Sequence, residues 1–268
     1  MRIVESRCKT KLLLPFEKFV TIAKETGYDA ICMRASVGGV GTPVSQLAQM
    51  RRAVHDSGLR ISMVTADANV PLNNAAGPNG LRHIEPSLDV AQSLDCDLIR
   101  VCLKQPADIP AAQRAAEQAA ECGIRLAHQC HTSSLFEQVA PMLDVLAAIG
   151  RPNFGLIYEP ANLMLCGESY GRATLERLAP HLMNAYFQNH GVEPDGPEIL
   201  PTYCRGEVRY CHLDPWEAGG IDLDEAFAGL NSVGYDGYFT IHQAQGIETA
   251  DEARTFASRC AQLMRRWI

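Results

Sequence analysis

The stretch that decides the fold is GYFTIHQ at Gly237–Gln243, an apolar run that ends in polar side chains. Three other apolar runs also end in a residue that can bind a metal or move a proton: RLAHQCH at Arg125–His131, FGLIYE at Phe154–Glu159 and LMNAYFQNH at Leu182–His190. In parallel α/β proteins, ligands bind at the carboxyl ends of the strands. The four segments therefore predict a functional site, and an enzymatic one.

Strands and helices are predicted to alternate along the whole chain. Continuous apolar runs, typical of strands covered on both faces, occur at Arg2–Cys8, Ala30–Arg34, Arg60–Ala66, Leu98–Leu103, Arg125–Gln129, Phe154–Glu159, Met183–Gln188 and Tyr238–Gln243. Amphipathic segments follow them at Phe16–Thr26, Val44–Ser57, Pro86–Leu94, Ala111–Cys122, Ser134–Ile149, Ala173–Leu178, Leu223–Ser232 and Ala250–Trp267. Eight such pairs in 268 residues predict an α/β fold, a single (β/α)8 TIM barrel over residues 1–268.

Glycines agree with the predicted helix ends. The residue just after a helix often has a left-handed backbone conformation, which Gly adopts most readily. The predicted positions are Gly27, Gly58, Gly123, Gly150 and Gly234.

A doubly wound open sheet is the competing fold, and it usually carries a Gly-rich phosphate loop after its first strand. Here that place is taken by Cys8–Lys11, which contains no glycine. The glycines at Gly38–Gly41, and the segment Asn73–Gly80, are expected as flexible loops at the barrel mouth, where the carboxyl ends of the strands meet. The long connection at about 190–220 is expected to be a lid-like loop over the site, because structureless stretches of this length are uncommon unless they are functional.

The composition of the chain argues against some classes of binding partner. A net charge of −7 argues against a nucleic-acid partner, since phosphate binding needs clustered Lys and Arg. We see neither a signal peptide nor an apolar run of membrane-spanning length, so we expect a cytoplasmic protein without a membrane partner. The ten cysteines include no Cys-x-x-Cys pair, which disfavours a zinc ribbon. A homo-oligomer is left open.

The pattern of these residues resembles the xylose-isomerase-like TIM barrels, which include sugar and sugar-phosphate isomerases and epimerases and the inosose dehydratases. The resemblance covers nearly the whole chain and is clearest from Arg125 onward and in GYDGY at Gly234–Tyr238. It implies a small-molecule carbohydrate substrate.

The resemblance also implies a divalent metal ion, which the family holds with a Glu after strand five, an Asp after strand six, a His on strand seven and a Glu after strand eight. Local matching places these ligands on Gln129, Glu159, Tyr186 and His242, so all four are changed. The segment YEPAN at Tyr158–Asn162 closely follows the family's Asp-Pro-x-Asn pattern. The predicted ligands of a Mn, Zn or Mg ion are Glu159, His242, Gln129 and His131, the last expected to point the same way as Gln129.

Several polar residues are expected to bind substrate: Asn162, Gln188, His190, Arg34, Lys104, His212 and Trp216. Alternatives stay open for four of them. Arg34 and Arg100 either pair with Glu5 inside the barrel or bind an anionic or hydroxyl-rich substrate. The same alternatives stay open for Lys104. His212 either supports the lid or contacts substrate. Trp216 either stacks on a sugar ring or anchors its loop. For His128 we predict a structural role.

The expected catalytic residues are His242, Glu159 and His131. An epimerase of this family is thought to use two metal-bound glutamates, and an amide such as Gln129 has no useful proton affinity near neutral pH. With His242 as the base, three functions remain: a metal-assisted isomerase or epimerase that removes a proton beside a carbonyl, a lyase or dehydratase that uses one base, and a degenerate barrel that only binds sugar. A DNA-repair endonuclease is disfavoured, because it would need more His and Glu ligands and a basic groove.

Overall fold

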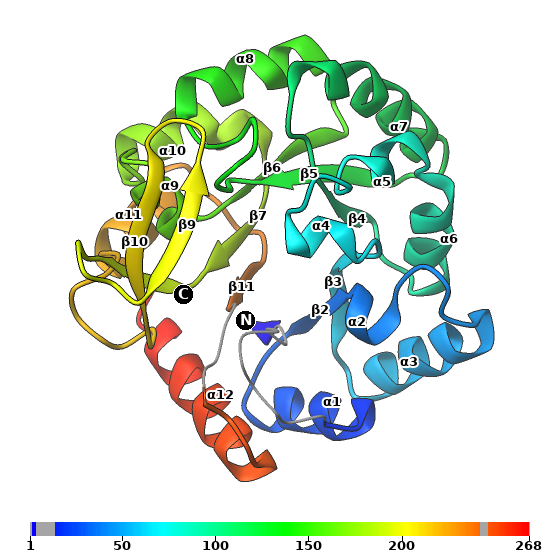
Figure 1. The fold of residues 1–268 in the computed structure, drawn as a ribbon. Coiled ribbons are helices and arrows are strands. Elements are labelled where there is room, and N and C mark those ends of the chain that lie inside the picture. Colours follow the sequence, from blue (N-terminus) through cyan, green and yellow to red (C-terminus); the bar gives the residue numbers. More distant parts are fainter. Residues whose placement is uncertain (1, 4–13, 242–245, 268) are drawn as a thin grey trace.

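Eight parallel strands close into a barrel in the order β1-β11-β7-β6-β5-β4-β3-β2 (Figure 1). The structure, a computed structural model, describes residues 2–3, 14–241 and 246–267. The barrel strands are β1 (Arg2–Ile3), β2 (Ala30–Arg34), β3 (Arg60–Thr65), β4 (Leu98–Val101), β5 (Arg125–Gln129), β6 (Phe154–Tyr158), β7 (Leu182–Phe187) and β11 (Phe239–Ile241). Each overlaps the run predicted for it, and the predicted TIM barrel is confirmed. Glu5, His242 and Gln243 lie outside the described residues.

Helices ring the barrel (Figure 1). The main ones are α1 (Phe16–Glu25), α3 (Val44–Asp56), α6 (Glu85–Ser93), α7 (Ile109–Glu121), α8 (Val139–Ile149), α10 (Arg172–Leu178), α11 (Leu223–Ser232) and α12 (Ala250–Met264). Shorter turns of helix are α2 (Ala35–Gly38), α4 (Asn69–Leu72), α5 (Asn79–Arg82), η1 (Pro106–Asp108), α9 (Pro160–Leu165) and η2 (Ala179–His181). The five predicted helix-ending glycines all have positive φ, from 58° at Gly150 to 84° at Gly27. No described helix has the length and apolar character needed to cross a membrane.

Two boundaries differ from the prediction. The loops expected at Gly38–Gly41 and Asn73–Gly80 are partly helical, since α2 ends at Gly38 and α5 begins at Asn79. The helix expected to start at Ser134 starts at Val139. Ser134 Oγ donates to the backbone oxygen of His131 and accepts from the backbone N–H of Phe136, and these local bonds favour a turn over a helix.

The barrel interior is apolar at its base and polar towards the mouth. Cys32, Met63, Leu98, Ala127, Ile157 and Tyr186 pack together inside it. Residues two apart on a strand face the same way, so Arg100 lies one layer above Leu98. The guanidinium carbon of Arg100 lies 5.8 Å from the centre of the Tyr186 ring, which confirms this direction. The apolar layer fills the base of the barrel, and the polar side chains therefore lie above it at the mouth.

The segment expected as a long loop at 190–220 forms a small antiparallel sheet instead. Its strands β8 (Asn189–Val192), β9 (Glu198–Thr202) and β10 (Gly206–Leu213) lie in the order β8-β10-β9 (Figure 1). The alternation of apolar and polar residues in β10 explains the difference, because Val208 and Tyr210 turn one face onto Leu165 of α9. A role of this sheet as a lid stays a prediction.

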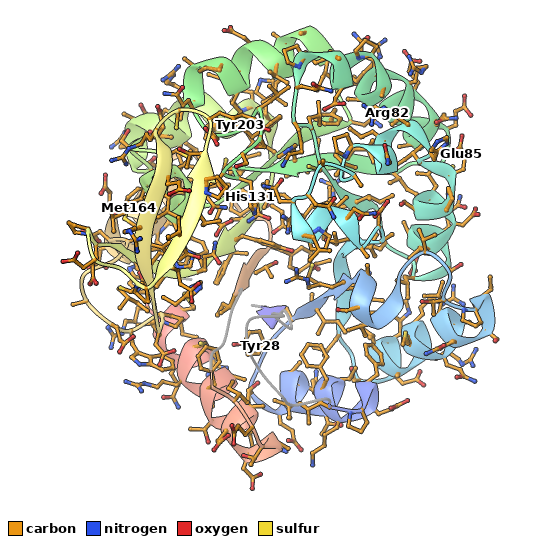
Figure 2. All side chains as sticks on the ribbon, viewed as in Figure 1. Tyr28, Arg82, Glu85, His131, Met164 and Tyr203 are labelled. Atoms are coloured by element: carbon orange, nitrogen blue, oxygen red, sulfur yellow. The ribbon has the colours of Figure 1, made fainter. Side chains whose placement is uncertain are left out.

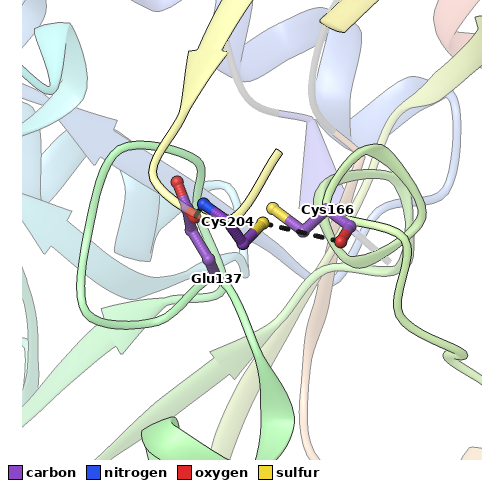
Figure 3. Close-up of side chains that lie close together, drawn as sticks. All are labelled: Glu137, Cys166 and Cys204. Atoms are coloured by element: carbon purple, nitrogen blue, oxygen red, sulfur yellow. Dashed lines mark hydrogen bonds between the residues drawn. The ribbon is translucent and has the colours of Figure 1, made fainter. Parts of the chain in front are cut away.

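The turn between β9 and β10 is fastened to the barrel by one buried carboxylate, Glu137, which is 4% exposed. Its Oε1 accepts from the backbone N–H of Ser133 and, at 2.8 Å, from that of Tyr203. Its Oε2 accepts from Tyr203 at 2.9 Å and from Cys204 at 2.8 Å. Figure 3 shows Cys204 beside it, with the Cys204 thiol 3.6 Å from the backbone oxygen of Cys166. We call these contacts of Glu137 the turn latch.

We expect Glu137→Gln to release this turn while the barrel stays folded. The amide of Gln turns a donor towards N–H groups, and each buried N–H left without an acceptor costs about 1–3 kcal/mol. Hydrogen exchange should therefore become faster at Tyr203 and Cys204 but not in β5 or β6. The control Glu207→Gln removes the same charge from an exposed position on β10. Unchanged exchange at Tyr203 and Cys204 in Glu137→Gln would show that the latch does not hold the turn.

Candidate functional site

Gln129 and Glu159 form the centre of the barrel mouth. Gln129 ends β5 beside Ile157 of β6, and Glu159 follows two residues later, one pleat towards the mouth. The Gln129 amide donates to Glu159 Oε2, which also accepts from Asn162 Nδ2 at 2.7 Å. The Gln188 side chain also acts on the Glu159 carboxyl, where it favours the charged form and lowers the pKa. The structure thus brings together four of the residues that sequence analysis singled out.

Two acceptor oxygens of this pair have no partner among the described residues. They are Gln129 Oε1 and Glu159 Oε1, and both are buried. Glu159 is fully buried, and its burial raises the pKa of its carboxyl to about 8, although the positive charge of Arg100 and the bond from Gln188 oppose this rise. The carboxyl is therefore largely protonated at neutral pH unless another positive charge joins it.

These oxygens fit a divalent cation. A buried acceptor without a donor is costly, and carboxylate and amide oxygens are ligands that Mg²⁺ and Mn²⁺ prefer. The fuller ligand set cannot be assembled from the described residues, because His242 lies outside them. Within that part of the chain, one group of three His, Cys, Asp or Glu side chains is close enough to share an ion, and it is Glu137, Cys166 and Cys204 at the turn latch.

His131 lies in the loop that follows β5, because the strand ends at Gln129. Its alignment with Gln129 and its role as a metal ligand stay predictions. Its Nδ1 lies 3.1 Å from Asn73 Nδ2 and 3.0 Å from the backbone oxygen of Thr132. Figure 2 shows His131 inside the ring of helices. Burial and the nearby positive charges of Arg100, Lys104 and Arg34 lower the pKa of His131 to about 3, so its ring is neutral at pH 7.

Asn73 organises this side of the mouth and was missed as a site residue. It accepts from Lys104 Nζ at its backbone oxygen, 2.7 Å away, and at its side-chain oxygen, 3.2 Å away. It has a left-handed backbone, with φ of 48°, a conformation that Asn tolerates better than most residues. The repeated Asn in NNAAGPNG was the available sign of such a turn. Lys104 lies at the mouth as predicted, and burial lowers its pKa.

Arg34 and Arg100 are both buried in the barrel, as their strand positions predict. Tyr186, which the resemblance places at a family metal ligand, lies below them in the apolar layer. Its hydroxyl is 3.1 Å from Cys32 Sγ, and burial raises its pKa well above the usual value. Tyr186 is therefore a neutral packing residue and a poor metal ligand.

The two histidines of the small sheet face each other. His190 of β8 is paired with His212 of β10, and their Nδ1 atoms are 3.2 Å apart. Burial and the neighbouring His212 lower the pKa of His190 to about 3. Their predicted contact with substrate stays a prediction. His128 bonds to backbone oxygens and stacks on Phe136 with centroids 4.2 Å apart, which agrees with the structural role predicted for it.

Trp216 packs on α12. The Arg259 guanidinium lies 3.7 Å from the centre of its ring, and the Phe256 ring centroid is 5.3 Å away. These contacts favour the loop-anchoring alternative over stacking on a sugar, because they cover the aromatic face that a sugar would use.

Comparison with solved structures agrees with the fold. A probable 3-DHS dehydratase, AsbF of Bacillus anthracis, involved in petrobactin synthesis, has a TM-score of 0.70 and 15% identity over 97% of this chain and 99% of its own. A D-allulose 3-epimerase from Methylomonas sp., in complex with D-allulose, has a TM-score of 0.67 and 16% identity over 94% and 91%. A xylose isomerase-like TIM barrel protein from Mycobacterium smegmatis, in complex with magnesium, has a TM-score of 0.66 and 15% identity over 94% and 89%.

No curated protein matches this sequence. The family model described as a xylose isomerase-like TIM barrel matches residues 20–260. This match spans most of the chain, and it agrees with the closed barrel and with the polar residues at its mouth. The chain belongs to the xylose isomerase-like TIM barrel family.

Proposed function

We propose that this protein is a metal-assisted enzyme that removes a proton beside a carbonyl group of a carbohydrate, as a sugar isomerase or epimerase does. The observation that carries the proposal is a pair of buried oxygens, Gln129 Oε1 and Glu159 Oε1, for which the described residues supply no hydrogen-bond partner. Family membership supports it. So does the similarity in fold to a D-allulose 3-epimerase and to a protein in complex with magnesium.

Glu159 and Gln129 would hold the ion, with His242 as the further ligand predicted from sequence. A bound divalent cation polarises a substrate carbonyl and makes the adjacent C–H more acidic. Asn162 and Gln188 orient the Glu159 carboxylate by their hydrogen bonds. Asn162 Nδ2 is itself fixed by a 2.8 Å bond to the backbone oxygen of Cys130.

His131 acts as a neutral hydrogen-bond donor rather than as a base. Nδ1 faces both the Asn73 amide and the backbone oxygen of Thr132. It accepts from the amide when the ring proton is on Nε2, and it donates to the carbonyl when the proton is on Nδ1. The positive charges nearby oppose formation of an imidazolium, so accepting a proton is unfavourable. In the tautomer with the proton on Nε2, the ring donates to a substrate oxygen and stabilises the negative charge that develops there. The role of proton-abstracting base remains the one predicted for His242.

A lyase or dehydratase is the second candidate, and Gln129 favours it. Epimerisation in both directions requires one group to remove a proton and another to return it. The Gln129 amide, which donates to Glu159, cannot do either. A single base is sufficient for elimination from a keto-glycoside or keto-polyol. Incubation with keto-sugars and glycosides in deuterated water, followed by NMR, separates the candidates. Deuterium at a retained carbon indicates isomerisation, and an unsaturated product indicates elimination. Neither result with any compound would favour a sugar-binding protein.

We predict that Glu159→Gln abolishes the response to metal. The substitution keeps the shape but removes the only charge of the described ligand pair, so affinity for Mn²⁺ should fall by more than about tenfold, or ~1.4 kcal/mol. The measurement is the shift in Tm on adding manganese chloride, together with elemental analysis. Glu207→Gln is the control. Equal metal content in wild type and Glu159→Gln would refute the site.

If the reaction is elimination, the second candidate, Gln129→Glu should tighten metal binding without raising kcat. A second carboxylate adds charge to the ligand set, but a one-base elimination needs no further proton acceptor. His242→Ala should lose activity. The comparison is made on whichever keto-sugar or glycoside proves active, with solvent deuterium exchange as the second readout. Activity that survives in His242→Ala, or efficient epimerisation in both directions by the wild type, contradicts the one-base mechanism.

A further inference from the structure

Arg100 is a buried cation for which the described residues supply no counter-ion. It is 5% exposed, and its Nε has no hydrogen-bond partner in the described part of the chain. Its guanidinium carbon lies 5.8 Å from the centre of the Tyr186 ring. Withdrawing a guanidinium from water is unfavourable unless an anion or several acceptors meet it. Among the described residues, this state leaves Arg100 able to take up an anion that enters the barrel mouth.

The carboxylates around the mouth already have other partners. Glu159 Oε2 accepts from Gln129 and Asn162. Asp108 pairs with Arg82 at 2.6 Å and accepts from the backbone N–H groups of Lys104 and Gln105. Glu137 holds the turn latch. Among the described residues, none of the three forms an ion pair with Arg100, and Glu5, the other partner considered for it, lies outside them.

Lys104 adds a second positive charge that lacks an ionic partner among the described residues. Its Nζ donates to the two oxygens of Asn73, which are neutral, and an ammonium has a third N–H. Lys104 Nζ and Cys102 Sγ both contact the Asn73 side-chain oxygen, at 3.2 and 3.6 Å, and Asn73 Nδ2 lies 3.1 Å from His131. The charges of Arg100 and Lys104 both act on Cys102 and on His131, which agrees with two cations bordering one region of the mouth. A metal ion held by Glu159 would make this region still more positive.

We propose that the barrel mouth binds a carboxylate group of its ligand between Arg100 and Lys104. The substrate is then a sugar acid or another hydroxylated carboxylic acid rather than a neutral sugar. The planar fork of Arg100 suits a carboxylate, to which it donates two parallel hydrogen bonds. The claim that this ligand is a substrate rests on the proposed function. The claim that the ligand is an anion does not rest on it.

Binding is tested on the full chain with three small probes: pyruvate, its neutral analogue hydroxyacetone, and inorganic phosphate. Saturation-transfer NMR should show pyruvate binding to the wild type, with hydroxyacetone binding more weakly. Affinity for pyruvate should fall about tenfold or more in Arg100→Met, and also fall in Lys104→Met. The control Arg52→Met removes an exposed Arg from α3 and should bind as the wild type does. Failure of the wild type to bind pyruvate overturns the proposal, as does tighter, Arg100-dependent binding of phosphate.

A second measurement needs no ligand. If Arg100 awaits an external anion, Arg100→Met should have a Tm equal to or above that of the wild type, because the variant removes an uncompensated buried charge. A lower Tm would show that Arg100 serves the fold instead, and would overturn the proposal. Glu159→Gln separates this proposal from the proposed function. That variant should lose the manganese response and still bind pyruvate, so either idea can fail while the other stands.

Discussion

The hydrogen bond between the Gln129 amide and the Glu159 carboxylate constrains the rest of the barrel mouth. It uses the amide N–H of Gln129 and one oxygen of Glu159, and it leaves the two remaining oxygens buried with no partner in the described ranges of the chain. The bond depends on the pairing of β5 with β6, since a slip of one residue would turn Glu159 to the other face of the sheet. Closure of the barrel therefore creates the site's chemistry as well as its shape.

The charge at the mouth is opposite to that of the chain. The protein has a net charge of −7, yet Arg34, Arg100 and Lys104 act together on His131. The nearby acids Asp108 and Glu137 bind backbone N–H groups, and the Glu159 carboxyl has a raised pKa. A region that is positive inside an acidic protein favours small anionic ligands and excludes none of the metal chemistry proposed at Glu159.

The small sheet of β8, β9 and β10 is an addition to the eight-stranded barrel, and hydrogen bonds fix it in place. Its strands β8 and β10 carry His190 and His212, while Glu137 fixes the turn at the other end. Asn189, at the start of β8, donates from its amide to the backbone oxygens of Asp214 and Glu217 and accepts from the N–H of Ile221. These buried bonds order a segment whose prolines and glycines had predicted a loop.

The sequence by itself determined the barrel and the identity of its central residues. Continuous apolar runs that alternate with amphipathic segments, and glycines after five of the predicted helices, leave few other folds, and strand ends such as Gln129 and Glu159 must converge once the strands are parallel. The tertiary structure alone decided the contacts of His131, the covering of Trp216 and the central place of Asn73. Those features depend on contacts between segments far apart in the chain, such as Lys104 with Asn73 and Glu137 with Tyr203, and local pattern carries no information about such pairs.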